Sequence, residues 1–187
     1  YKLDTRNRAI GFPILQTIKE SVDPDLVLDA GDTFHGQSFA TLAEGMSIAT
    51  LMEMLGYDAT TPGNHDWSYG ADKLRAMTGH STTGTPFAML CANATSSNGV
   101  WSSSITKTLN RTWKDGEDSS TFNYKIKVGV VGAMDESLGS SLRADLVAGT
   151  SFSSAANAIN VEAEQLRKEG CDVVVCIAHT LDAKTFA

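Results

Sequence analysis

The sequence lacks any hydrophobic run long enough to cross a membrane, and it has few cysteines. One of its longest apolar stretches, residues 173–178, is far shorter than the roughly 20 residues of a membrane-spanning helix. The three cysteines, Cys91, Cys171 and Cys176, show no Cys-x-x-Cys spacing, which argues against a zinc knot or a redox pair. We interpret them as structural thiols, because free cysteine commonly behaves as a small buried hydrophobe.

Basic residues are also scarce. The chain has 15 Lys and Arg against 22 Asp and Glu, a net charge of −7, which argues against a broad nucleic-acid surface because duplex binding depends on neutralising phosphates. The 187 residues are 42% hydrophobic, which excludes a disordered tail or a collagen-like repeat. We predict one domain over residues 1–187, with a sizeable core.

Helical and extended patterns alternate along the chain. Apolar periodicity predicts helices over 13–22, 44–55, 71–77 and 154–169, and short apolar or β-branched runs predict strands over 26–28, 57–61, 87–91, 125–131 and 172–178. The stretch 92–121 is rich in Ser, Thr, Asn and Gly, and we expect it to form an excursion that carries a hairpin. This alternation predicts an α/β domain.

Three predicted strands end in polar residues with metal-binding chemistry. Asp32 follows the first strand, Asn64 and His65 follow the second, and His179 follows the last. Ligands of open α/β sheets bind outside the carboxyl ends of the strands, so these side chains are expected at one rim. Carboxylate, amide oxygen and imidazole together form a plausible ligand set for a divalent cation such as Zn²⁺, Mn²⁺ or Mg²⁺.

Each of these residues alone has a simpler interpretation. Asp32 could belong to an ordinary turn, and His179 could be a hydrogen-bonded core histidine. His35 and His80 lie in polar surroundings, where surface or loop roles are favoured over ligation. The inference of a functional site therefore depends on the three strand ends taken together.

At these residues the sequence resembles the calcineurin-like metallophosphoesterases, and within them the 5′-nucleotidase, 2′,3′-cyclic phosphodiesterase and UDP-sugar hydrolase family. The matching segments are Leu-Asp-Ala-Gly-Asp-Thr-Phe-His-Gly-Gln at 28–37, Leu-Gly-Tyr-Asp-Ala-Thr-Thr-Pro-Gly-Asn-His-Asp at 55–66, Lys-Val-Gly-Val-Val-Gly at 127–132 and Asp-Val-Val-Val-Cys-Ile-Ala-His-Thr at 172–180. The resemblance implies a metallophosphatase-like four-layer α-β-β-α sandwich with two mixed β-sheets, incomplete in this chain.

The resemblance also implies two divalent metal ions and a role for each strand-end residue. Asp32 would bridge both ions, and Asn64 and His179 would each ligate one of them. His65 would lie beside the substrate phosphate, stabilise the transition state and protonate the leaving oxygen. Many nucleotidases carry an acidic residue three positions after this histidine, where the present chain has Ser68; Asp66 or Ser68 would then have to orient His65.

Two further motifs of the family are absent from these 187 residues. Neither Asp-x-His nor Gly-His-x-His occurs, although the family places them before the Asp32 strand and after the His179 strand. We therefore expect the chain to be a truncated catalytic domain that binds metal weakly or partially and turns over little nucleotide by itself.

The leading hypothesis is hydrolysis of nucleotide phosphate esters by a metal-activated water. By resemblance, the parent protein would be extracellular, periplasmic or anchored to the cell wall, with a small-molecule nucleotide substrate, a C-terminal substrate-binding domain and no nucleic-acid partner. The alternatives are a phosphoesterase for cyclic nucleotides, sugar nucleotides or phosphoproteins, and a non-catalytic surface-binding module with a degenerate site.

Overall fold

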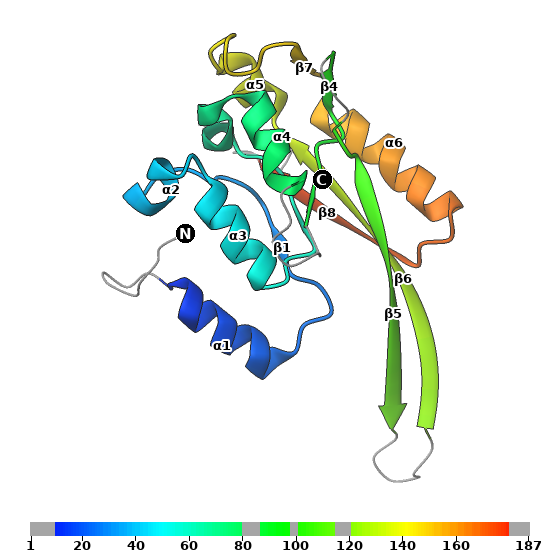
Figure 1. Ribbon diagram of the computed structural model, residues 1–187. Coiled ribbons are helices and arrows are strands. Elements are labelled where there is room, and N and C mark those ends of the chain that lie inside the picture. The colour runs from blue at the N-terminus through cyan, green and yellow to red at the C-terminus, as the bar shows by residue number, and fades with distance from the viewer. Residues whose placement is uncertain (1–9, 80–86, 98–100, 115–120, 180–187) are drawn as a thin grey trace.

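The computed structural model describes residues 10–79, 87–97, 101–114 and 121–179 (Figure 1). Its helices are α1 (Phe12–Val22), α2 (Ser38–Leu42), α3 (Met46–Met54), α4 (Ala71–Gly79), α5 (Glu136–Ser141), α6 (Ala155–Lys168) and the 3₁₀ helix η2 (Asn64–Tyr69). Its strands are β1 (Leu28–Asp29), β2 (Ala59–Thr60), β3 (Ala88–Met89), β4 (Ala94–Ser96), β5 (Ser104–Lys114), β6 (Thr121–Met134), β7 (Thr150–Phe152) and β8 (Val173–His179).

The described strands form two three-stranded sheets and one small two-stranded sheet. The first sheet has the order β1-β2-β3 and is entirely parallel. The second has the order β5-β6-β8, in which β6 pairs antiparallel with β5 and parallel with β8. Strands β4 and β7 form the small antiparallel sheet. Of the two main sheets, only the second is therefore mixed in the part of the chain that the structure describes.

Three hydrophobic clusters separate four layers. The first packs α1, α3 and α4 against one face of the β1-β2-β3 sheet, and includes Met52, Leu74 and Met89. The second lies between the two main sheets, where Val128 and Val130 of β6 face Ala59 and Leu90. The third cluster joins β6 to α6 (Figure 1). Alternating β6 residues thus belong to two different cores, as the two-residue period of a strand requires. The predicted α-β-β-α sandwich is confirmed.

Most predicted elements are present, and their boundaries differ by a few residues. Helix α2 was not predicted, and the predicted helix over 44–55 corresponds to α3, which begins at Met46 because its N-cap Gly45 adopts a φ of +87°. That left-handed conformation suits glycine but interrupts a right-handed helix. Strand β6 starts at Thr121, not at 125, and its residues 121–131 pair antiparallel with the whole of β5. The expected hairpin is therefore formed by β5 and β6, and its second strand extends beyond the predicted range of 92–121 to Met134.

The cysteine prediction needs one correction. All three cysteines are free; Cys91 and Cys171 are buried, whereas Cys176 is exposed. Burial raises the pKa of the Cys91 thiol to about 12. Cys176 lies on β8, whose only strand partner among the described residues is β6, so that an apolar sequence run leaves this thiol open to solvent.

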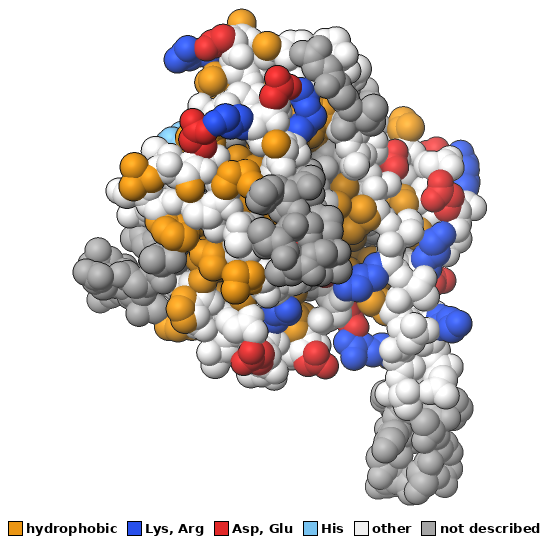
Figure 2. All heavy atoms as spheres, viewed as in Figure 1, with side chains coloured by type: hydrophobic (Ala, Val, Ile, Leu, Met, Phe, Trp, Pro, Cys, Tyr) orange, Lys and Arg blue, Asp and Glu red, His pale blue; other side chains and the backbone are white. Residues whose placement is uncertain are grey.

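Apolar side chains also reach the surface at helices α1 and α3. A groove of about 420 Å³ lies between α1 and α3, lined by Phe12, Pro13 and Leu51 among others. Ile14 and Met54 are exposed on the same two helices, where Figure 2 shows hydrophobic side chains at the surface. No helix in the described part of the chain combines the length and apolarity that a membrane crossing requires.

Candidate functional site

The first site loop, residues 30–35, is shaped by the buried carboxylate at the end of β1. The Asp29 Oδ1 atom accepts hydrogen bonds from the Gly31 amide at 3.0 Å, the Thr33 hydroxyl at 2.7 Å and the Thr60 hydroxyl at 2.9 Å. Gly31 and Asp32 both have positive φ, +93° and +58°. A non-glycine residue in that region is uncommon, although Asp tolerates it better than most. Asp29 therefore helps to hold the unusual backbone that presents Asp32.

The second site loop, residues 61–66, lies against the first in direct backbone contact. A Cβ atom built on Gly31 would lie 2.5 Å from the Gly63 amide nitrogen and 2.7 Å from the Thr61 carbonyl oxygen. A Cβ atom on Gly63 would in turn overlap Asp32. Both glycines are therefore required by close approach, and any side chain at either position would push the loops apart.

Asp66 joins the two loops through four hydrogen bonds. Its Oδ1 atom accepts from the amides of Thr33 at 2.8 Å and Phe34 at 2.7 Å, and its Oδ2 atom accepts from the amides of Asp32 at 2.7 Å and Gly63 at 2.8 Å. The side chain is fully buried. Burial raises the pKa of the Asp66 carboxyl, while the four backbone hydrogen bonds act in the opposite direction.

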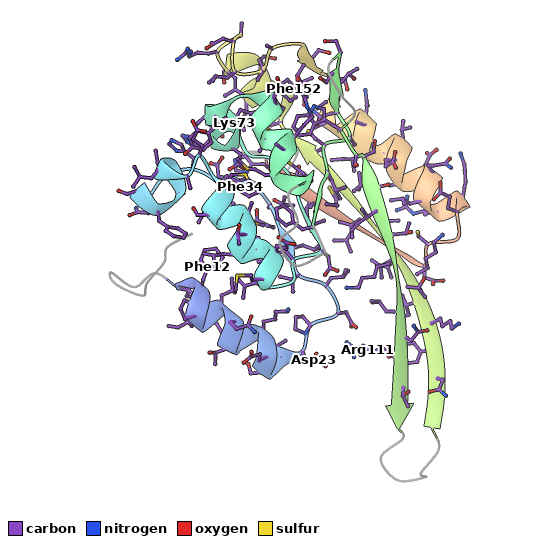
Figure 3. The ribbon with its side chains drawn as sticks, viewed as in Figure 1. Phe12, Asp23, Phe34, Lys73, Arg111 and Phe152 are labelled. Carbon is purple, nitrogen blue, oxygen red and sulfur yellow. The ribbon has the colours of Figure 1, made fainter. Side chains whose placement is uncertain are left out.

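These hydrogen bonds bear on the orientation of His65, a role that the sequence left open between Asp66 and Ser68. Both Asp66 oxygens are engaged with backbone amides, so Asp66 holds the loops together and its recorded bonds do not involve the His65 ring. The Ser68 hydroxyl donates to the backbone carbonyl of His65 at 2.6 Å, again not to the ring. Figure 3 labels Phe34, one of the four amide donors to Asp66, whose side chain is enclosed by the core next to α3 and α4.

His179, at the end of β8, faces Asp32, and a contact of its ring with the backbone indicates which ring nitrogen carries the proton. Its Nδ1 atom lies 2.7 Å from the carbonyl oxygen of Ala30. Because a carbonyl only accepts hydrogen bonds, Nδ1 carries the proton, and in the neutral ring Nε2 keeps its lone pair. Nε2 lies 3.5 Å from Asp32 Oδ2. In the neutral ring, two acceptor atoms therefore face each other across this gap.

Asn64 and His65 open the 3₁₀ helix η2 directly beside Asp32. The His65 amide donates to Asp32 Oδ1 at 2.9 Å, and the His65 side chain is exposed. The structure thus brings Asp32 into contact with both His65 and His179, as the strand-end argument predicts. Thr61 adds a direct link between the two main sheets, since its hydroxyl donates to the Ala133 carbonyl at 3.1 Å.

The facing pair suits a divalent cation. Two ligands about 2.1 Å from one ion at a tetrahedral angle are about 3.4 Å apart, which matches the 3.5 Å between His179 Nε2 and Asp32 Oδ2. A cation would satisfy both lone pairs at once. Within the described residues, no three side chains from His, Cys, Asp and Glu gather as a metal cluster, so a cation held by this pair would need further ligands.

One histidine that sequence patterns assigned to a surface or loop role lies beside the site. The His35 ring stacks on the His65 ring, with centroids 5.9 Å apart and planes 13° from parallel. In the sequence, the only sign that His35 lies near the site is its position three residues after Asp32, because its contact with His65 joins two separate loops. His80 lies outside the described residues.

Known proteins place these features in a family. The family model described as calcineurin-like phosphoesterase matches residues 11–182. The rat 5′-nucleotidase is 38% identical over 63 residues, which cover 34% of this chain and 11% of the rat protein. Endonuclease YhcR of Bacillus subtilis is 26% identical over 164 residues, 82% of this chain and 12% of that protein.

A solved structure agrees with this assignment at the level of the fold. The calcineurin-like phosphoesterase YfkN from Bacillus subtilis superposes with a TM-score of 0.72 at 24% identity, covering 92% of this chain and 53% of the YfkN chain. The matched segments therefore span about a tenth of the length of the rat 5′-nucleotidase and endonuclease YhcR, and the superposed part spans about half of the YfkN chain. Because the family model covers most of the chain and the fold agrees with it, the chain belongs to the calcineurin-like phosphoesterase family.

Proposed function

We propose that the protein hydrolyses phosphate esters of nucleotides, as a metal-dependent phosphoric monoester hydrolase of the 5′-nucleotidase type. The observation that carries the proposal is the pair formed by Asp32 Oδ2 and His179 Nε2, 3.5 Å apart, with Nδ1 of His179 held by the Ala30 carbonyl. This arrangement gives the imidazole the tautomer that a metal ligand needs. The similarity to the rat 5′-nucleotidase supports the substrate class.

The residues of the chain would then divide the work. Asp32, Asn64 and His179 would hold divalent cations of the zinc, manganese or magnesium class at the rim of the sheets. Such cations supply an acidified water and positive charge for the phosphoryl oxygens. His65, whose amide is fixed on Asp32 Oδ1 and whose side chain is exposed, would stabilise the transition-state charge and give a proton to the leaving oxygen.

The test is phosphate release from AMP by the full-length protein, with Mn²⁺ or Zn²⁺ and with a chelator. We expect cation-dependent release, and loss of about 100-fold or more of kcat in Asp32→Asn because the anionic ligand is removed. Asp23→Asn is a matched control, since Asp23 is an exposed aspartate that also has a positive φ, +46°, at the end of α1.

Two results would contradict the proposal. One is a full-length protein that releases no phosphate with any of these cations; the other is an Asp32→Asn variant as active as Asp23→Asn. We further propose that this chain alone releases little or no phosphate, because its own residues supply only part of the ligand set. Strong turnover by the purified 187-residue chain would contradict that statement.

A substrate panel separates the alternative phosphoesterases. Cyclic nucleotides, sugar nucleotides and phosphopeptides belong in it, and so does DNA, because one relative is named an endonuclease. We favour small nucleotides over DNA, since the net charge of −7 opposes binding to a polyanion. An extracellular, periplasmic or wall-anchored location and a C-terminal substrate-binding domain are also proposals, which cell fractionation and limited proteolysis of the full-length protein would check.

A further inference from the structure

His35 contacts two rings of η2. Its ring stacks on His65, with centroids 5.9 Å apart and planes 13° from parallel, and it contacts Tyr69 at 5.7 Å with a tilt of 43°. These distances fall in the range of favourable aromatic pairs. His35 comes from the first site loop, whereas His65 and Tyr69 come from opposite ends of η2. These ring contacts therefore join two segments that are far apart in the sequence.

Hydrogen bonds already fix the backbone next to His35 and at His65. Thr33 and Phe34, directly before His35, donate their amides to Asp66, and Asp66 is itself part of η2. The His65 amide is fixed on Asp32 Oδ1. What these bonds leave free is the rotation of the His65 side chain about its two torsions.

The stacked ring of His35 limits the rotation of the His65 ring. His65 is exposed, so burial does not restrain its ring, while His35 is half-buried. Tyr69 also contacts the His35 ring, which limits how far His35 can turn. A ring held in this way offers His65 a flat surface in one orientation only.

We propose that His35 is a positioning residue that holds the His65 imidazole, by ring stacking, in the orientation in which it meets the substrate phosphate. The inference rests on the proposed function for the role of His65, and the stacking itself does not. His35 makes no contact with substrate and transfers no proton. Its contribution is to reduce the number of orientations that the His65 ring samples before reaction.

The test uses two substitutions at one position. His35→Ala removes the ring, and we expect kcat of the full-length protein for AMP to fall about 3- to 10-fold, the size of one aromatic pair, with little change in KM. His35→Phe keeps a flat ring without nitrogen atoms and is expected to recover most of kcat. Gln37→Ala, at an exposed position two residues further on, is the control and should match the wild type.

A second readout does not depend on activity. In ¹H–¹³C spectra of the 187-residue chain, the ring signals of His65 should move in His35→Ala, because the ring current of the neighbouring imidazole is lost, and should move much less in Gln37→Ala. Thermal unfolding of each variant checks that the fold is intact.

The outcomes separate the two proposals. His65 ring signals and a kcat that are both unaltered in His35→Ala overturn the positioning role, and so does a His35→Phe variant as impaired as His35→Ala. A wild-type protein without phosphatase activity overturns the proposed function instead. In that case the His65 ring signals still decide whether the His35 ring stacks on the His65 ring.

Discussion

The two site loops and the outer end of the β5-β6 hairpin differ in the acceptors of their backbone amides. In the loops the acceptor is a buried side-chain carboxylate, and in the hairpin it is the facing strand. We define the outer ribbon as residues 110–114 of β5 and 121–125 of β6. In the site loops, one buried carboxylate, Asp66, collects four amides from residues 32, 33, 34 and 63. In the outer ribbon the two strands pair with each other, and β8 pairs with β6 only from Val128 onward.

The outer ribbon extends away from the body of the molecule, as Figure 1 shows. Figure 3 shows Arg111 reaching from it toward the loop after α1, where Arg111 forms an ion pair with Asp25. An isolated two-stranded ribbon is only marginally stable in water. The candidate site is therefore held by contacts between segments far apart in the sequence, whereas we infer that the ribbon adds little to the stability of the whole.

Removing the Asp66 carboxylate is expected to have the largest effect on this contrast. In Asp66→Ala, four amides lose their acceptor within the core, and we expect the free energy of unfolding to fall by about 3 kcal/mol or more. Urea unfolding followed by circular dichroism measures it. Asp145→Ala is the control, since Asp145 is exposed and its carboxylate pairs with the nearby Arg143; a similar loss there would remove the special status of Asp66.

The next effect concerns the close approach of the loops. Gly31→Ala combines a positive φ with overlap onto Gly63, and we expect a loss of about 3 kcal/mol. Gly170→Ala shares the positive φ, +84°, but meets no atom within 4 Å, so about 1 kcal/mol is expected. The difference between the two, from denaturant midpoints, isolates the loop contact. Equal losses would show that the two loops are free to separate.

The smallest effect compares two threonines. Thr61 is fully buried, and its hydroxyl bonds Ala133 across the sheets, so Thr61→Val, which keeps the shape, should cost about 1–2 kcal/mol. Thr112 is exposed in the outer ribbon, and its hydroxyl bonds Asn123 at 2.7 Å; Thr112→Val should change stability by less than about 0.5 kcal/mol. If calorimetry found the larger loss at Thr112, the ribbon would be more important to the fold than we infer.

Local patterns allowed much of the fold to be predicted. Helix α6 has Ser154 as its N-cap, with buried Ile159 and Leu166 on one face, and each of these signals lies within the helix sequence. The strand ends were equally readable, because the residue that follows an apolar run is known from the sequence alone. These signals led to Asp32, Asn64, His65 and His179.

What could not be predicted depends on contacts between distant segments. Asp66 is adjacent to His65 in sequence, yet its partners at residues 32–34 are known only once the two loops are in place. The stacking of His35 on His65 has the same origin. The extra length of β6 was missed for a different reason, since polar residues such as Thr121 and Asn123 leave no apolar run at the start of this strand.

We infer that the protein holds the two site loops in place before any cation binds. Hydrogen exchange in the presence of a chelator tests this most directly, at the amides of Asp32, Thr33, Phe34 and Gly63. We predict that these four exchange slowly, close to the rate set by global unfolding, while the hydrogen-bonded amides of the outer ribbon exchange much faster. The claim would be contradicted if the four amides exchanged as fast as the ribbon and became protected only after Mn²⁺ or Zn²⁺ was added.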